Sequence, residues 1–237
     1  MILAGAVGGM LYALIAAGLR TRFGASEILV TLMLSLIAVQ VLNYLLLGPW
    51  KDPKGFNFPQ SVMFPDNALL PTLFAGTRTN ISLIFALIFS VFAHLLMQNH
   101  FRGYQLRTAG LAPRAALYAG FSAPRMIWLS LGLGGLAAGI AGASEVAGPL
   151  GQLQRSVPSG YGYAAIIVAY MGGLRPIGIV LSSFLISVIY IGGDSATVTA
   201  GLPVAAVEVF QGFLLVFYLL TFILIRYRVS FFSQATP

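Results

Sequence analysis

Long, uninterrupted apolar runs alternate with shorter polar intervals along the chain. A helix needs about 20 apolar residues to cross a bilayer, and continuous runs favour helices over the alternating strands of a membrane barrel. The fifth run is short and flanked by glycine, which is typical of a broken or partial span. The runs lie at residues 2–19, 28–47, 80–98, 126–147, 161–172, 176–191 and 203–225. We therefore predict an all-α integral membrane protein, a polytopic bundle of about six to seven membrane-spanning helices in one transmembrane domain, 1–237.

The polar interval 102–125 differs from an ordinary connection because it also has a helical pattern. Its basic residues are Arg102, Arg107, Arg114 and Arg125, and it has no acidic residue. Pro113 fits the first turn of a helix, where its missing N–H costs little. Ala115, Ala116 and Ala119 can continue that helix, and Gly120 can end it. Two interpretations remain open: a short helix that docks on a cytoplasmic partner, or an interfacial loop.

The interval 48–79 is rich in Pro, Gly and Asn. It is either a surface that receives a substrate or a delivery protein, or a turn-rich cap over the helices.

Composition supports the membrane class. Hydrophobic residues make up 58% of the chain, charged residues 8%, and mean hydropathy is +0.90. Soluble proteins contain about 25% charged residues. A net charge of +7 would suggest nucleic acid for a soluble chain, but here the positive-inside rule explains it, and we expect no nucleic-acid partner.

The same rule predicts the orientation. The cytoplasmic side would hold Arg20, Arg22, the interval 102–125, Arg175, Arg226 and Arg228. The outer side would hold Lys51, Lys54, Arg78 and Arg155, and with them the loop 48–79. Met1 leads directly into an apolar run that lacks the features of a signal peptide, so we expect an internal helix whose preceding segment is missing.

No motif in the sequence indicates catalysis. The sequence contains no phosphate-binding loop, no HExxH or GxSxG motif and no cysteine, and it shows no cluster of His and carboxylates for a metal. We expect no catalytic residue, metal or cofactor, so energy for uphill transport would come from a partner.

Polar residues within or beside the apolar runs are candidates for a solute path. A polar group in lipid must find partners, so it faces other helices or a watery cavity, in a structural or a functional role. The candidates are Ser35, Gln40, Asn43, Glu145, Gln152, Tyr161, Tyr163, Glu208 and Gln211. Gly135 and Gly139 form a GxxxG pair, which predicts close helix packing.

The segment RTAGLAPRAALYAGFSAPRM is similar to the cytoplasmic segment of ABC importer permeases of the branched-chain amino acid and simple-sugar superfamily. Their coupling helix has the pattern Gly-x-x-x-x-Ala-Ala-x-x-x-Gly, which Gly110, Ala115, Ala116 and Gly120 match. The likeness continues in LGGLAAGIAGASEVAGPLG and PSGYGYAAIIVAYMGGLRPIGIVLSSFL, and RFGASEILVTLMLSLIA resembles the nucleoside and simple-sugar branch. Family members are usually longer at the N-terminus, and that branch commonly has Asn where this chain has Ser35.

The resemblance implies a multi-pass permease subunit in a bacterial inner membrane. Its partners would be two ABC ATPase subunits, a second permease subunit, and a periplasmic or lipid-anchored binding protein that delivers a nucleoside or simple sugar. Residues implied in coupling to the ATPase are Arg107, Gly110, Pro113, Arg114, Ala115, Ala116 and Gly120. Residues expected near the substrate path are Ser35, Asn43, Glu145 and Gln211. The alternatives are a truncated remnant that no longer transports, or a passive channel or scaffold subunit. An ion-coupled secondary transporter would require paired intramembrane charges, which the sequence nearly lacks.

Overall fold

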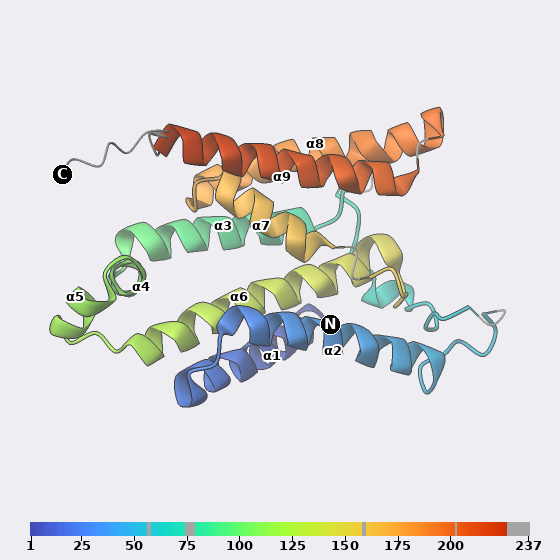
Figure 1. The fold of residues 1–237 in the computed structure, drawn as a ribbon. Coiled ribbons are helices and arrows are strands. Elements are labelled where there is room, and N and C mark those ends of the chain that lie inside the picture. Colours follow the sequence, from blue (N-terminus) through green and yellow to red (C-terminus); the bar gives the residue numbers. More distant parts are fainter. Residues whose placement is uncertain (56–57, 74–78, 158–159, 202, 227–237) are drawn as a thin grey trace. The chain divides into compact units, whose positions relative to one another are not determined.

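A computed structural model describes residues 1–55, 58–73, 79–157, 160–201 and 203–226, with only part of the side chains near the end of the chain. It divides into two units, Met1–Ser159 and Gly160–Pro237, which we treat separately. The first unit contains α1 (Ile2–Phe23), α2 (Glu27–Leu47), η1 (Asp66–Ala68), α3 (Ser82–Asn99), α4 (Phe101–Leu111), α5 (Pro113–Tyr118), α6 (Ala123–Glu145) and η2 (Val146–Leu150). The second contains α7 (Tyr161–Met171), α8 (Pro176–Ala200) and α9 (Val204–Arg226) (Figure 1).

The predicted all-α membrane class is confirmed. Within the described residues, five helices are long and apolar enough to cross a membrane: Ile2–Phe23, Glu27–Leu47, Ser82–Asn99, Ala123–Leu150 and Pro176–Thr199. The helix α7 spans about 16 Å at 1.5 Å per residue, about half of the hydrocarbon thickness, as expected for a partial span. The number of crossings stays a prediction.

Several helix ends differ from the predicted spans for local reasons. α1 continues past residue 19 to Phe23 and ends at Gly24, whose φ of 65° gives a left-handed cap. α3 begins at Ser82 rather than at residue 80, because Asn80 forms an isolated bridge with Thr72. α6 starts three residues before the predicted 126 and continues through η2, a single turn of π-helix.

A seam of small residues joins α1 to α6. A methyl group on Gly9 would stand 2.7 Å from the Cα of Gly139, and one on Gly139 would overlap the carbonyl of Gly5. The backbones of the two helices are therefore in direct contact, as GxxxG pairs allow in a bilayer. The sequence had indicated Gly135 and Gly139; the matching pair on α1, Gly5 and Gly9, was missed.

In the second unit, α7 and α8 meet at a tight turn. A methyl group on Gly172 would lie 2.5 Å from the amide nitrogen of Ile179, so glycine is required for this approach. The hydroxyl of the buried Ser182 donates to the carbonyl of Val168 at 2.8 Å. The turn includes Leu174, at φ 56°, the one non-glycine residue with positive φ in the described part of the chain.

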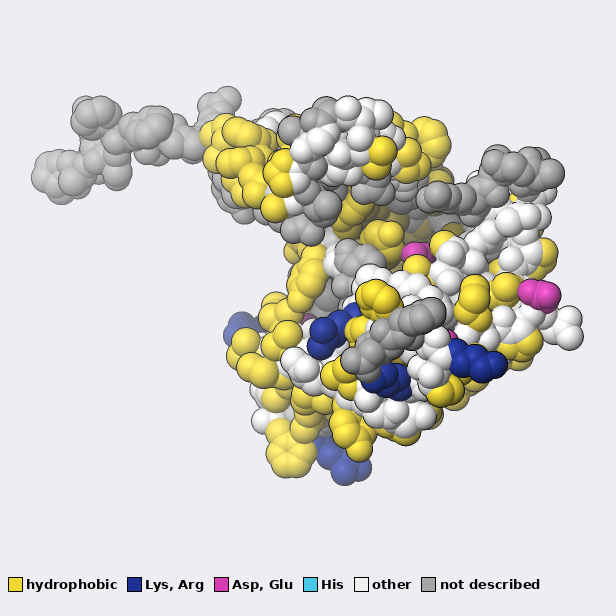
Figure 2. Space-filling view, turned by 90° about the vertical axis from the view of Figure 1, so that its right-hand side faces the viewer, with side chains coloured by type: hydrophobic (Ala, Val, Ile, Leu, Met, Phe, Trp, Pro, Cys, Tyr) yellow, Lys and Arg dark blue, Asp and Glu magenta, His cyan; other side chains and the backbone are white. Residues whose placement is uncertain are grey.

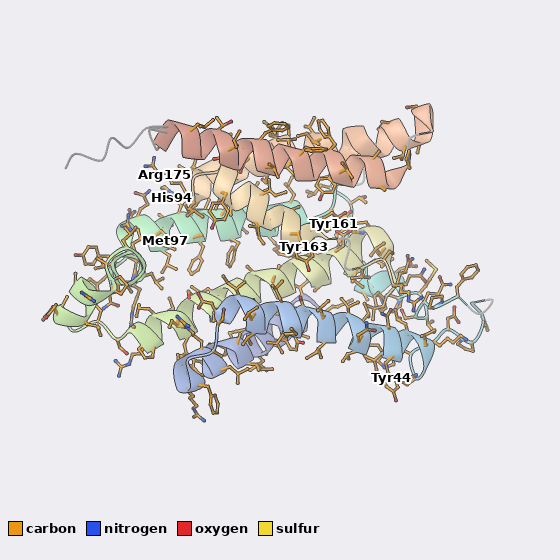
Figure 3. All side chains as sticks on the ribbon, in the orientation of Figure 1. Tyr44, His94, Met97, Tyr161, Tyr163 and Arg175 are labelled. Carbon is orange, nitrogen blue, oxygen red and sulfur yellow. The ribbon has the colours of Figure 1, made fainter. Side chains whose placement is uncertain are left out.

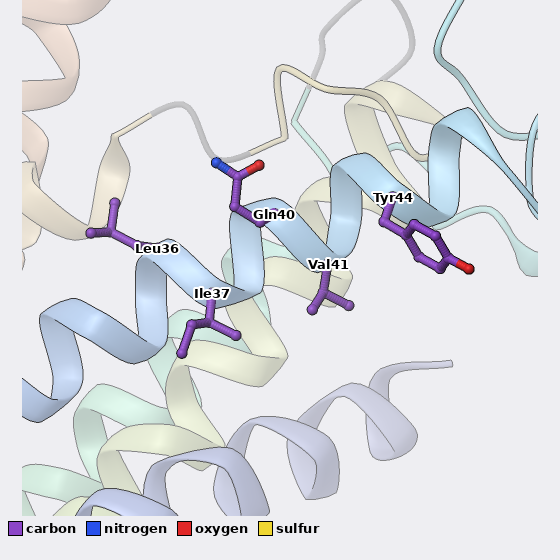
Figure 4. A pocket seen from close by; sticks show the side chains of 5 residues that line it. All are labelled: Leu36, Ile37, Gln40, Val41 and Tyr44. Atoms are coloured by element: carbon purple, nitrogen blue, oxygen red, sulfur yellow. The ribbon is translucent and has the colours of Figure 1, made fainter.

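Most large apolar side chains of the helices are exposed in the isolated chain (Figure 3). On α2, one shallow depression of about 380 Å³ is lined by Leu36, Ile37, Gln40, Val41 and Tyr44, all from the same helix (Figure 4). A membrane-length helix whose side chains have so few neighbours faces lipid or another protein. The protein is a multi-pass membrane protein whose outer surfaces are apolar.

Candidate functional site

The first unit has two polar ends of different chemistry, which lie at opposite ends of α6 (Figure 1). The indole N–H of Trp128 donates to the Thr21 hydroxyl at 3.1 Å, which places the end of α1 beside the start of α6. We call residues 20–25 and 100–125 the arginine end, and residues 43–73 and 146–157 the cap end. The arginines of the arginine end are Arg20, Arg22, Arg102, Arg107, Arg114 and Arg125, and all six are exposed.

The charges of the cap end are fewer and of mixed sign (Figure 2). They are Lys51, Asp52, Lys54, Asp66 and Arg155. The other end holds six arginines and no acidic residue, and this imbalance is the asymmetry that the positive-inside rule describes.

Two short helices build the arginine end. His100 ends α3 and caps α4, because its Nδ1 accepts a hydrogen bond from the backbone N–H of Arg102 at 3.3 Å. The helix α4 ends at Ala112, whose backbone angles (φ −142°, ψ 74°) are not helical, and Pro113 then begins α5 as predicted. Gly120 has φ 76°, and its N–H bonds to the carbonyl of Leu117 at 3.0 Å. The last helical residue of α5 is Tyr118, and Gly120 lies just beyond the cap residue Ala119, so the predicted role of Gly120 in ending the helix is observed.

A close contact joins α4 to α3. Gly103 is buried, and a methyl group on it would overlap the carbonyl of Leu96 and lie 2.7 Å from the Cα of Met97. A larger residue there would push α4 away from α3.

Three aromatic rings join α4 to the segment that follows α5. The ring centroids of Phe101 and Phe121 lie 5.9 Å apart, and those of Tyr104 and Phe121 6.1 Å apart, both edge to face. Phe101 and Tyr104 stack at 6.4 Å. Such pairs contribute about 0.5–1.5 kcal/mol each beyond the area they bury.

Between these joints, the last residue of α4 and the end of α5 present exposed apolar side chains, which we call the tip. Leu111, Leu117 and Tyr118 are 87%, 63% and 95% exposed, whereas Ala116 is 1% exposed and holds the inner side of α5. Large apolar groups so fully exposed in a polar segment are typical of a contact surface.

The predicted coupling residues all lie at this end, but they do not share one helix. Arg107 and Gly110 lie on α4, and the others lie on α5 or just after it; these are Pro113, Arg114, Ala115, Ala116 and Gly120. A methyl group on Gly110 would meet nothing within 4 Å, so the chain itself does not require glycine there. The sequence reasoning missed Leu111, Leu117 and Tyr118, although apolar residues in a basic interval were a usable signal.

At the cap end, the backbone of the loop is bound to the segment after α6. The amide of Ser61 donates to the carbonyl of Leu153 at 2.9 Å, and the Ser61 hydroxyl accepts from the amide of Leu153 at 2.9 Å. Phe64 donates to Gly151 at 2.9 Å in the same way. The described part of the interval 48–79 thus forms a cap pinned to residues 147–157, and a surface role for it stays untested.

The residues predicted to line the path are not brought together by any direct contact in the described part of the chain. Asn43 accepts a hydrogen bond from Nε of Arg155 at 2.9 Å, and the exposed Ser35 donates to the carbonyl of Leu32 within its own helix. Glu145 is half-buried at the end of α6. Beside it, Ser144 is 6% exposed, and its hydroxyl has no hydrogen-bond partner among the described groups.

The other polar candidates have varied settings. Gln152 donates to the side-chain oxygen of Gln60 at 3.4 Å within the cap. Tyr161 and Tyr163 are exposed on α7. The side chains of Glu208 and Gln211 lie outside the described residues. The described residues include no group of three or more His, Cys, Asp or Glu that could hold a metal ion.

Known proteins resemble this chain over nearly its whole length. Residues 1–219 match the family described as branched-chain amino acid transport system, permease component. A glucose ABC transporter permease of Haloferax volcanii is 32% identical over 97% of this chain and 63% of its own length. A guanosine permease of Bacillus subtilis is 29% identical over 92% of this chain and 63% of its own length. A nucleoside permease of Lactococcus lactis is 28% identical over 94% of this chain and 64% of its own length.

The chain thus spans less than two thirds of the length of these curated relatives. No solved structure matches it.

Proposed function

The chain belongs to the family of permease components of branched-chain amino acid transport systems, and from that premise we propose that it is the membrane-spanning subunit of an ATP-binding-cassette importer. The observation that carries the proposal is the exposed tip of α5, in the polar segment that connects the membrane-length helices α3 and α6. ATP hydrolysis would take place on a separate ATPase subunit.

We propose that α5 is the docking helix for that ATPase. Leu117 and Tyr118 would enter an apolar groove, and the nearby Arg107 and Arg114 would face acidic or headgroup partners at its rim. Gly110, with open space around it, would let the partner approach the end of α4 closely. The arginine end would then lie in the cytoplasm, as the positive-inside rule predicts.

The solute we propose is a small polyhydroxylated molecule, a simple sugar or a nucleoside. The relatives that support this choice are named for glucose, guanosine and nucleosides. Ser35, Asn43, Glu145 and Gln211 remain the proposed path residues, and we add Ser144 because its buried hydroxyl has no partner among the groups that the structure describes. A second permease subunit and an extracytoplasmic binding protein would complete the assembly in the cytoplasmic membrane.

In this mechanism, closure of the ATPase pair moves α5, and the helices attached to it change the access of the path from one side of the membrane to the other. α1 and α6 would move together, because their backbones are in contact along the glycine seam.

A site-specific photo-crosslinker tests the proposal. Benzoylphenylalanine would replace Tyr118 in native membranes, and the matched control would replace Tyr44, an exposed tyrosine at the cap end (Figure 3). We expect a crosslink to an ATP-binding subunit from position 118 and none from position 44. Equal capture at both positions, or none at 118, would overturn docking through α5 and favour a passive channel or scaffold.

A further inference from the structure

We propose that α4 and α5 form a rigid bracket that fixes the docking tip to α3 and α6 at the same time. Gly103, Phe101, Tyr104 and Phe121 are then positioning residues for coupling, although they lie behind the tip rather than on it. The inference rests on the proposed docking of α5, but its geometric part is measured without a partner.

The first joint of the bracket is the elbow between α3 and α4. Only His100 separates the two helices, and its side chain caps the second of them. The missing side chain of Gly103 lets α4 contact the backbone of Leu96 and Met97 directly. Backbone groups cannot rotate away as side chains do, so the angle between α3 and α4 is fixed by contact.

The second joint lies where the chain leaves α5 for α6. Phe121 contacts Phe101 and Tyr104 with its ring, and its N–H donates to the carbonyl of Ala116 at 2.9 Å. Phe121 therefore connects the first turn of α4, the middle of α5 and the start of α6. Without these contacts, α5 would be held only by the packing of Ala116 on its inner side and by its two flanking breaks, at Ala112 and Gly120.

The two joints decide whether a movement of the α5 tip reaches the membrane-length helices. If α5 could swivel on Ala112 and Gly120, movement of its tip would be absorbed locally. With both joints closed, movement of the tip carries α3 through the elbow and α6 through Phe121. α6 in turn carries α1, because Gly139 lies against the backbone of Gly5.

The chain has no cysteine, so a pair of spin labels can be introduced without removing native thiols. The labels would replace Tyr118 and Ile88, which are 95% and 61% exposed on α5 and α3. Pulsed electron resonance on the whole chain should give one narrow distance distribution, and Phe121→Leu should broaden it. The matched control is Phe92→Leu, which removes one ring of the Phe89–Phe92 pair on α3, whose centroids lie 6.1 Å apart, and should leave the distribution narrow.

The coupling role has a separate readout in the transport complex. Phe121→Leu should leave binding of the ATPase unchanged and lower the solute taken up per ATP several-fold, whereas Phe92→Leu should leave that ratio unchanged. Gly103→Ala is expected to disturb the packing of α4 on α3 and so reduce assembly of the transport complex. The test of coupling therefore uses Phe121→Leu.

The outcomes separate the two claims. A broad distribution in the parent chain, or no broadening in Phe121→Leu, overturns the bracket whether or not an ATPase binds. Broadening with an unchanged uptake ratio overturns its role in coupling. If the crosslinker at position 118 finds no ATPase, docking fails, and the label distances still decide whether the bracket exists.

Discussion

The two ends of α6 are held in different ways. At the arginine end, aromatic rings and one glycine contact hold two short helices, and Leu117 and Tyr118 project outward. At the cap end, main-chain hydrogen bonds hold the loop from Ser61 to Leu70 against the residues that follow α6. The first arrangement fixes particular side chains at a particular place, whereas the second fixes the course of a loop with little use of its side chains.

This difference predicts where substitutions matter. At the arginine end, the identity of a few residues should decide both local stability and coupling. At the cap end, only residues that supply a buried hydrogen bond should matter. Both ends depend on α6 keeping its place against α1.

The largest effect on stability should come from Gly139→Ala, which disturbs the glycine contact between α1 and α6. The added methyl would overlap the carbonyl of Gly5 and stand 3.1 Å from the Cα of Ala6, and neither backbone atom can yield cheaply. Overpacking of this kind costs about 1–3 kcal/mol or more. Thermal unfolding in detergent measures it. The control is Gly142→Ala on the same helix, where the new methyl meets nothing within 4 Å and the better helix propensity of alanine should stabilise by up to about 1 kcal/mol.

Gly120→Ala should also have a large effect, at the arginine end. At φ 76° an alanine is strained by about 1–2 kcal/mol, so the end of α5 should loosen. The melting temperature should fall, and protease should cut faster near residue 120.

Gly110→Leu is the counterpart of that variant. Because the space beside Gly110 is open, the free energy of unfolding should stay within about 0.5 kcal/mol of the parent's, as for ordinary surface changes. Uptake per ATP should fall, because the leucine would block close docking. A variant with normal uptake would remove Gly110 from the docking surface.

Ser61→Ala tests the cap end. The serine is 7% exposed, and its loss would leave the amide of Leu153 without its acceptor, at a cost of about 1–3 kcal/mol. Hydrogen exchange should speed up in residues 151–155 and stay unchanged in α5. Ser35→Ala, which removes an exposed hydroxyl bonded within its own helix, should leave both regions unchanged.

The smallest effect is expected for Asn43→Ala. It removes the hydrogen bond from the exposed Arg155, and exposed polar contacts contribute about 0–1 kcal/mol. Asn43→Asp keeps the acceptor and should restore stability. A loss of solute uptake in Asn43→Ala without a loss of stability would instead support the predicted path role.

The apolar runs predicted the long helices because a bilayer demands nearly continuous apolar sequence. Pro113 and Gly120 predicted the bounds of the short helix α5, because proline fixes φ near the helical value and glycine readily adopts the positive φ of a helix end. The elbow at His100 and Gly103 escaped prediction, since nothing local marks a glycine that must accept another helix. Contacts between distant residues, such as Gly9 with Gly139 or Asn43 with Arg155, follow from packing, which a single sequence does not express.

The attachment of the cap by its backbone has a consequence for how such a protein can diversify. The amides of Ser61, Phe64 and Leu70 and the carbonyls they bind are common to nearly every amino acid. Outward side chains of this loop can therefore mutate freely while its anchorage is inherited intact. Natural variation can change the surface chemistry of the cap without disturbing the fold, whereas the proposed docking role would leave the tip of α5 no comparable freedom.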